Sequence, residues 1–226
     1  MERIISKLKE KFEVKEEIEI KYDLEDTGRV DFLPDGKKVR LVIPPEINYY
    51  DLVDLFGLIK LGEINYLLAT FYFQKDLTEE EKKYAEMFHL LCQPLQDVWC
   101  YKIIKNYLQE DEYKEIIQDL VNLYENVKEI VEAPPMEGVE MPEDIKRRLY
   151  VSTALILEKT SNADVNLIIT GKYKKEWEIY LFWIRHFADL KPDPKYFVKL
   201  PKITSAPYEV KIKKSEIEYY EVKKKQ

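Results

Sequence analysis

The fold is decided by residues 46–70, whose sequence is EINYYDLVDLFGLIKLGEINYLLAT. When this segment is placed on a helix, its apolar residues cover nearly the whole circumference instead of a single stripe. A helix with apolar residues all round belongs in a protein interior. We therefore expect one buried helix over residues 46–70.

Alternating apolar residues before this segment predict three short strands, at residues 18–24, 30–32 and 39–43. Asp35-Gly36, between the second and third strands, is a strong hairpin signal. The simplest arrangement that joins three such strands through short turns is an antiparallel meander. We expect this meander to end at Pro44-Pro45.

Further helices are predicted from apolar residues at three- and four-residue steps, at residues 3–12, 78–107, 116–131, 145–159 and 177–187. Thr78 and Glu81 form a capping-box pattern at the start of the second of these helices, and Pro94 should kink or divide it. Near the end of the chain, alternation at Tyr208, Val210 and Ile212 predicts an exposed strand, with residues 216–222 as a hairpin partner. The predicted class is α+β: a small antiparallel sheet on a mainly helical body, with C-terminal strands.

The segment 132–142 contains three prolines and one glycine, which is typical of a linker or an exposed loop. It divides the chain into residues 1–133, with the sheet and the buried helix, and residues 134–226, with further helices and basic strands. A single continuous domain is the alternative.

The composition is that of a globular protein, with 46% hydrophobic and 35% charged residues in a chain of 226. The charged residues are mostly Lys and Glu, a bias typical of heat-adapted proteins. Charges interrupt the N-terminus and the longest apolar stretches, so neither a signal peptide nor a membrane span is predicted, and we expect a cytoplasmic protein.

Net charge is unevenly distributed. The whole chain carries −7, whereas residues 191–226 hold ten Lys against five acidic residues, which leaves −12 for the first 190 residues. Lys211, Lys213 and Lys214 lie in the predicted basic strand. They are candidates for binding nucleic acid or an acidic partner, although lysines also protect an exposed sheet edge. The same strand could recruit a second copy of the chain.

Motifs of common enzyme classes are missing from the sequence. It contains six glycines and no glycine-rich phosphate-binding loop, which disfavours nucleotide-driven chemistry.

Cys92 and Cys100 would lie about 12 Å apart along one helix, too far for a disulfide, so buried free thiols are expected. Glu86, His89 and Cys92, with Asp97 nearby, have spacings found in metal sites. A histidine packed in a helical core beside a free cysteine is the favoured interpretation.

Residues 58–68, LIKLGEINYLL, resemble the active-site helix of zincin metallopeptidases, where a His-Glu-x-x-His motif binds zinc and supplies a general base. Gly62 and Tyr66 stand at the two histidine positions, and Glu63 stands at the base position. Gln96-Asp97 is similar to the Glu-Asp pair that provides the third ligand in the gluzincin branch. The resemblance covers about residues 38–108.

This resemblance implies a zincin-like scaffold that has lost all three zinc ligands, with Glu63 as a vestigial catalytic residue. Without a metal, Glu63 cannot activate water at neutral pH, and a simple ion pair with Lys60 is its expected role. We therefore predict a non-enzymatic interaction or structural protein without a cofactor. The alternative is a zinc-dependent peptidase with atypical ligands. Its site would draw on Glu63, Glu86, His89, Cys92 or Asp97.

Overall fold

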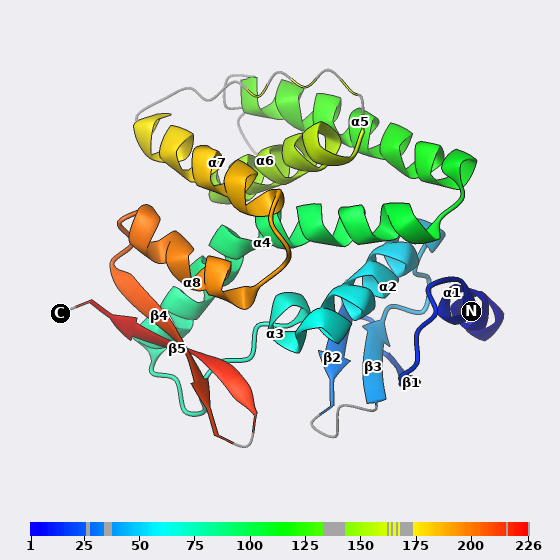
Figure 1. The fold of residues 1–226 in the computed structure, drawn as a ribbon, viewed down its shortest axis with the longest axis horizontal. Coiled ribbons are helices and arrows are strands. Elements are labelled where there is room, and N and C mark those ends of the chain that lie inside the picture. The colour runs from blue at the N-terminus through cyan, green and yellow to red at the C-terminus, as the bar shows by residue number, and fades with distance from the viewer. Residues whose placement is uncertain are drawn as a thin grey trace.

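A computed structural model of the chain describes residues 1–25, 28–33, 38–132, 143–161, 163, 165, 167, 174–215 and 217–225 (Figure 1). It confirms the α+β class, with a small sheet packed on a mainly helical body. In Figure 1 the N-terminal sheet and the C-terminal hairpin lie at opposite ends of the layer that contains α2 and α4, and α5, α6 and α7 form a second layer above.

The N-terminal sheet contains β1 (Glu17–Tyr22), β2 (Arg29–Phe32) and β3 (Lys38–Ile43), after α1 (Glu2–Lys11). Its order is β1-β3-β2, with β2 antiparallel and β1 parallel to β3. The predicted meander was therefore wrong about β1, which pairs with β3 and not with β2. Alternation identifies the two faces of a strand but not its neighbours. The predicted turn at residues 35–36 lies outside the described residues.

The predicted helix over residues 46–70 is present but broken, as α2 (Tyr49–Ile64) and α3 (Tyr66–Ala69). Asn65 between them has an extended backbone, and its side chain accepts a hydrogen bond of 2.9 Å from the amide of Leu67. Asn therefore caps a new helix instead of continuing the old one. The burial of α2 agrees with the prediction: Leu52, Val53, Phe56 and Ile59 are fully buried.

The long helix α4 (Glu79–Tyr107) begins at the predicted capping box and runs undivided through Pro94. Thr78 Oγ1 accepts from the amide of Glu81 at 3.2 Å, and Glu81 accepts from the amide of Thr78 at 2.9 Å. Pro94 has no N–H to donate to the carbonyl of Leu90, four residues earlier. The next carbonyl, that of Leu91, accepts a hydrogen bond from the Tyr180 hydroxyl at 2.7 Å, which ties α7 to this part of α4.

The second layer consists of α5 (Glu110–Glu132), α6 (Glu143–Thr160) and α7 (Lys174–Ala188). Helix α6 packs against both α4 and α5, and one hydrophobic core includes residues from both sides of residue 133. Of the predicted linker over residues 132–142, Glu132 belongs to α5, and residues 133–142, with the predicted boundary, lie outside the described residues. None of the helices in the described part of the chain is long and apolar enough to cross a membrane.

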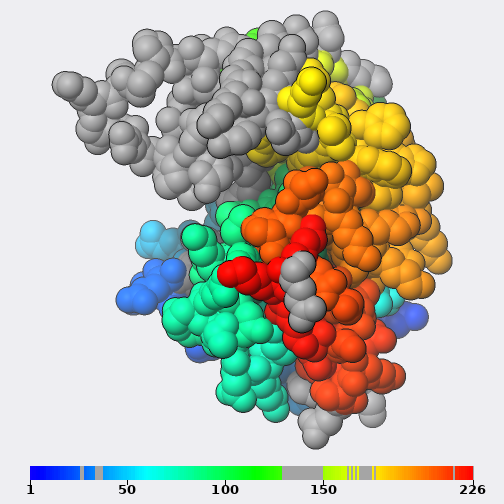
Figure 2. Space-filling model, turned by 90° about the vertical axis from the view of Figure 1, so that its left-hand side faces the viewer, coloured from blue at the N-terminus to red at the C-terminus, as the bar shows by residue number. Residues whose placement is uncertain are grey.

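The chain ends with α8 (Pro194–Ile203) and the predicted hairpin, formed by β4 (Tyr208–Lys214) and β5 (Glu218–Lys224). Figure 2 shows this hairpin, in red, between α8 and the first part of α4. It is less exposed than predicted, because Tyr208, Val210, Tyr220 and Val222 are buried. The outer edge of β5 is covered, since the amide of Tyr220 donates to the carbonyl of Tyr72 at 2.7 Å.

Candidate functional site

Gly62, at the first predicted histidine position, lies against an aromatic ring. A Cβ atom added at Gly62 would stand 1.9 Å from Cζ of Phe32. Heavy atoms cannot approach so closely, so any larger residue here requires Phe32 or the backbone to move. The sheet can therefore pack this closely against α2 only because residue 62 has no side chain.

Tyr66, at the second predicted histidine position, connects α3 to the C-terminal hairpin. Its hydroxyl donates to the carbonyl of Glu218 at 2.8 Å, and its ring meets that of Tyr72 edge-on, with centroids 5.8 Å apart. Burial raises the pKa of Tyr66, so the hydroxyl remains a protonated donor. The break at Asn65 also means that residues 62 and 66 do not share one continuous helix, as the zincin motif requires.

Gln96, at the third predicted ligand position, is a buried hydrogen-bond donor. Its Nε2 donates to the carbonyls of Leu68 and Ala69, at 2.6 and 3.1 Å. These carbonyls lie at the end of α3, where the helix itself leaves them without partners. A carboxylate in the same place would face two acceptors and repel both. The amide is therefore suited to its position as a structural group.

The residues at these three positions do not fit a zinc ion. Gly62 offers no ligand atom, Tyr66 is committed to Glu218, and the amide nitrogen of Gln96 is committed to two carbonyls. No chemical step through a metal follows from this arrangement. Gly62, Glu63 and Tyr66 do, however, line one common pocket, from which Gln96 is absent.

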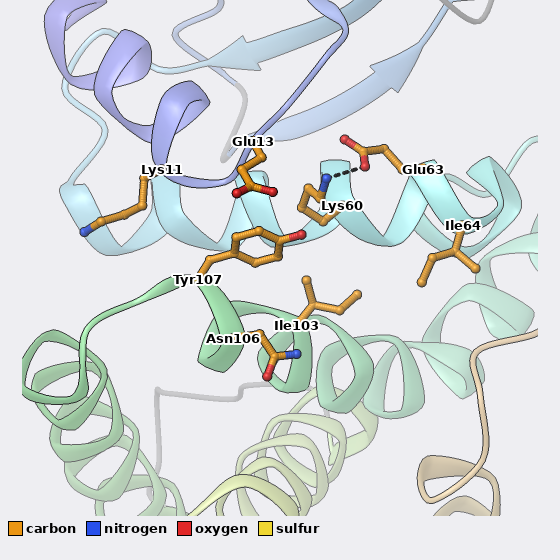
Figure 3. Close-up of a pocket in the computed structure, with 8 residues that line it drawn as sticks. All are labelled: Lys11, Glu13, Lys60, Glu63, Ile64, Ile103, Asn106 and Tyr107. Atoms are coloured by element: carbon orange, nitrogen blue, oxygen red, sulfur yellow. Dashed lines mark hydrogen bonds and ion pairs between the residues drawn. The ribbon is translucent and has the colours of Figure 1, made fainter.

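Glu63 is paired with Lys60, the residue one turn earlier on α2, as predicted (Figure 3). Burial raises the pKa of Glu63, against the opposing effect of Lys60, and the neighbouring carboxyl of Glu16 adds to the rise. Two carboxyls held close together disfavour ionisation of both. A positive charge placed beside them would relieve this repulsion.

We call the hollow beside these residues the Glu63 pocket. It has a volume of about 560 Å³ and is lined by Glu16, Asp31, Phe32, Leu33, Arg40, Gly62, Glu63, Tyr66, Tyr72 and Ile217. Within its wall, Oε2 of Glu16 and Nε of Arg40 are buried and have no hydrogen-bond partner. Most buried polar atoms in folded proteins are hydrogen-bonded, so these two require an explanation.

A second hollow, of about 740 Å³, lies on the other side of Glu63, between α1, α2 and the end of α4 (Figure 3). Lys11 and Lys60 contribute its positive charges, and both are engaged: Lys11 pairs with Glu112, and Lys60 pairs with Glu63. The ammonium of Lys60 also stands 5.5 Å from the centre of the Tyr107 ring. Both positive charges of this hollow are therefore already paired within the protein.

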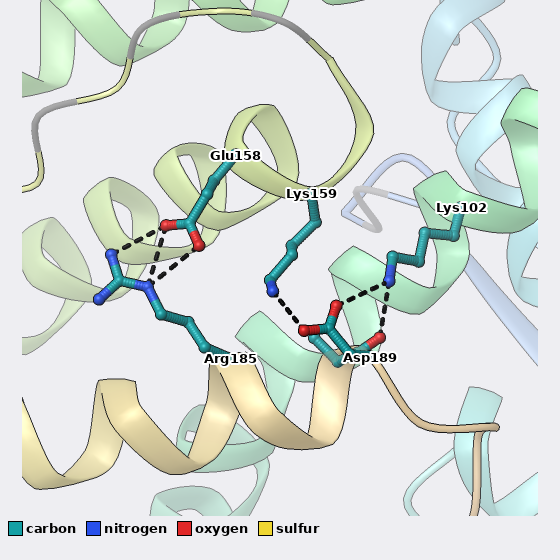
Figure 4. A network of polar contacts seen from close by, with 6 residues as sticks. Lys102, Glu158, Lys159, Arg185 and Asp189 are labelled. Atoms are coloured by element: carbon teal, nitrogen blue, oxygen red, sulfur yellow. Dashed lines mark hydrogen bonds and ion pairs between the residues drawn. The ribbon is translucent and has the colours of Figure 1, made fainter.

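Another charged cluster lies where α6 and α7 end against α4 (Figure 4). Asp189 pairs with Lys159 at 2.7 Å and with Lys102 at 3.4 Å, and Arg185 pairs with Glu158 at 2.8 Å. Lys102 also donates to the carbonyl of Ala188 at 2.8 Å, at the negative end of the α7 dipole. These charges hold helices together and satisfy one another.

The alternative metal set on α4 does not converge. Glu86 and His89 are exposed, whereas Cys92 is fully buried, with its thiol 4.0 Å from the carbonyl of Phe197. Each step of three residues rotates a helical position by about 60°, so Cys92 faces about 120° away from Glu86. Asp97 accepts a hydrogen bond from Ser152 of α6. The described residues contain no group of three His, Cys, Asp or Glu placed to hold a metal.

The predicted basic strand carries matching acidic residues. Lys211 pairs with Glu209 at 2.8 Å and lies opposite Glu221, while Lys213 lies opposite Tyr219 and Lys214 opposite Glu218. Alternating charges give a weaker field for phosphates than a continuous basic patch. Because residues 72–74 cover the outer edge of β5, an added strand from a partner or a second copy would have to pair with β4.

Several residues of the Glu63 pocket were not predicted from the sequence. Glu16 directly precedes β1, Asp31 lies in β2 and Arg40 lies in β3, and only the strand pairing brings them together. Asp54 on α2 was also missed. It accepts from the Tyr101 hydroxyl at 3.0 Å, and burial raises its pKa to about 7. No motif in the sequence marks any of these four.

Comparison with protein-family models, curated proteins and solved structures finds no match to this chain. The resemblance to zincins therefore stays a prediction, and the function has to be inferred from the pocket itself.

Proposed function

We propose that the chain is a non-enzymatic interaction protein on a metal-free scaffold, and that it binds a small ligand in the Glu63 pocket. One observation carries this proposal. The residues at the three degenerate ligand positions make structural contacts, while Gly62, Glu63 and Tyr66 line a pocket of about 560 Å³ whose wall also includes the apolar side chains of Phe32, Leu33 and Ile217.

The zincin resemblance supports the origin of such a scaffold, with a binding pocket left beside a lost metal site. Pockets of about 300–1,000 Å³ are typical of small-molecule sites, and the Glu63 pocket is within this range.

Metal content and peptide hydrolysis test the non-enzymatic part of the proposal. Protein produced in zinc-supplemented medium should hold no stoichiometric zinc by mass spectrometry and should not cleave a mixture of fluorogenic peptides. Glu63→Gln and the control Glu17→Gln, an exposed glutamate on β1, should behave alike. One tightly held zinc per chain, or cleavage that disappears in Glu63→Gln alone, would favour the hydrolase alternative and overturn the proposal.

A further inference from the structure

The outer face of α7 carries apolar side chains that the fold leaves exposed. Phe182 is 66% exposed, and Ile179, nearly one turn earlier, is 50% exposed. The ring of Phe182 stands edge-on to that of Trp183, with centroids 5.6 Å apart, so a neighbour holds it in place. Single exposed apolar residues are common on proteins. Adjacent ones that include an aromatic ring are typical of a surface that contacts another protein.

Polar and charged side chains are arranged symmetrically about Phe182. Lys175 and Glu178 precede it by seven and four residues, and Asp189 and His186 follow it at the same two intervals. At about 100° per residue, all four lie within about 40° of Phe182 around the helix axis. All four are exposed. One helix face therefore has Phe182 at its centre and unlike residues at equal distances on either side.

A second copy of α7 in the antiparallel orientation is complementary to this face. If a twofold axis passes beside Phe182, each residue faces the one at the same interval on the other side of the centre. Lys175 then faces Asp189, Glu178 faces His186, and the two Phe182 rings meet. A parallel arrangement would instead set Lys175 against Lys175 and Glu178 against Glu178, and like charges across an interface repel.

The charges of this face favour a second copy over other partners. An anionic membrane surface attracts a helix whose polar residues are mainly basic, whereas Glu178 and Asp189 place carboxylates beside Phe182. Asp189 pairs with Lys159 and Lys102, yet its side chain remains 58% exposed and so stays accessible to a further cation. An unrelated protein would not require the symmetric spacing.

We propose that the chain forms a twofold-symmetric dimer through α7, with the two helices antiparallel and Phe182 at the axis. Helix α7 has 15 residues and is therefore about 22 Å long, or about four turns. A contact of this size is small for a protein interface, so we expect a weak dimer with a dissociation constant of about 10–100 μM. The dimer goes beyond the proposed pocket function and does not depend on it.

Disulfide cross-linking of the full-length chain tests the orientation. Cys92 and Cys100 are buried, so the unaltered chain offers no accessible thiol. Glu178→Cys and His186→Cys, one of them carrying an affinity tag, should cross-link to each other when mixed and oxidised above the expected dissociation constant. Neither should cross-link alone, because two copies of position 178 lie about 12 Å apart along antiparallel helices. Cross-linking of Glu178→Cys with itself, or none in the mixture, would overturn the proposal.

Sedimentation tests whether this face holds the dimer together. Phe182→Glu should raise the dissociation constant at least about tenfold, because it removes the central apolar contact and places two carboxylates at the axis. Leu24→Glu is the matched control, since Leu24 is an even more exposed apolar residue that directly follows Asp23 at the N-terminal sheet. It should leave the dimer unchanged.

Three results would contradict the proposal. A dimer equally tight in Phe182→Glu would assign dimerisation to another surface, such as the outer edge of β4. A monomer at every concentration up to about 1 mM would exclude the dimer. Binding of that monomer to phosphatidylserine vesicles, lost in Phe182→Glu, would reassign this face of α7 to a membrane.

Discussion

The Glu63 pocket and the cluster at the ends of α6 and α7 both gather charged side chains, yet they differ in how their polar atoms are satisfied. In the cluster, Asp189 meets two lysines and Lys102 also reaches a helix-end carbonyl (Figure 4). In the pocket, Glu16 and Arg40 each keep a buried atom without a partner. The number of charges therefore does not show how fully a cluster is satisfied, whereas the unsatisfied atoms do.

Gln96→Glu should have the largest effect on stability, because it places a carboxylate against two carbonyls that now receive hydrogen bonds. We expect the free energy of unfolding at pH 8 to fall by about 4 kcal/mol, as for other buried charges without a partner. Urea denaturation measures this change, with the exposed Gln118→Glu as control. Unchanged stability together with newly bound zinc would show that position 96 is still a metal site.

Asp54 is intermediate between the pocket and the cluster, because it is a buried acid that accepts a single side-chain hydrogen bond, from the Tyr101 hydroxyl. Its pKa is raised in the folded state to about 7, from 3.8 in an unfolded chain, so the folded protein binds the extra proton. Stability from this proton is complete below pH 4 and is lost as the pH rises to 7.

Urea unfolding should therefore show a loss of about 1.4 kcal/mol per pH unit between pH 5 and 7, about 3 kcal/mol in total. Asp54→Asn should remove this slope. A slope of the same size in Asp54→Asn would assign it to another group.

Gly62→Ala tests the packing that closes the pocket against the sheet. The added Cβ meets the Phe32 ring, so we expect a loss of about 2 kcal/mol, typical of overpacking. Phe32→Leu in the same chain should recover part of that loss, which a double-mutant cycle of thermal denaturation would measure. Additive losses would mean that the two residues do not compete for space.

Lys159→Gln should have a small effect, since it breaks one ion pair of the cluster. Asp189 would keep Lys102, and pairs with exposed partners contribute about 0.5 kcal/mol. The loss should shrink further at high salt, as screening weakens the pair in the unaltered chain. A loss that salt does not change would point to packing of the lysine stem instead.

Much of the fold was predictable from the sequence, because helices follow from local periodicity. The capping box at Thr78 was predicted from a local signal. The parallel pairing of β1 was not, since strand partners depend on contacts far apart in the chain. Helix α8, which begins at Pro194 after the N-cap Asp193, was missed because it is short and contains a second proline, Pro201.

The candidate site was predictable only where its residues are consecutive. Glu63 stands out in an apolar helix, and its partner Lys60 lies one turn away. Glu16 and Arg40 gave no local signal, because their meeting depends on the order of the strands. Gln96 was predicted to stand at a lost ligand position, whereas the two carbonyls that its amide binds come together with it only in the folded structure.

The most direct test of this comparison is the free energy of unfolding of Glu16→Gln, measured in urea beside Lys159→Gln without added ligand. An unsatisfied carboxylate held close to Glu63 costs stability, so Glu16→Gln should stabilise the protein by up to about 1 kcal/mol, while Lys159→Gln destabilises it. A loss of stability in Glu16→Gln as large as that in Lys159→Gln would contradict the account, because Glu16 would then already have a partner within the fold.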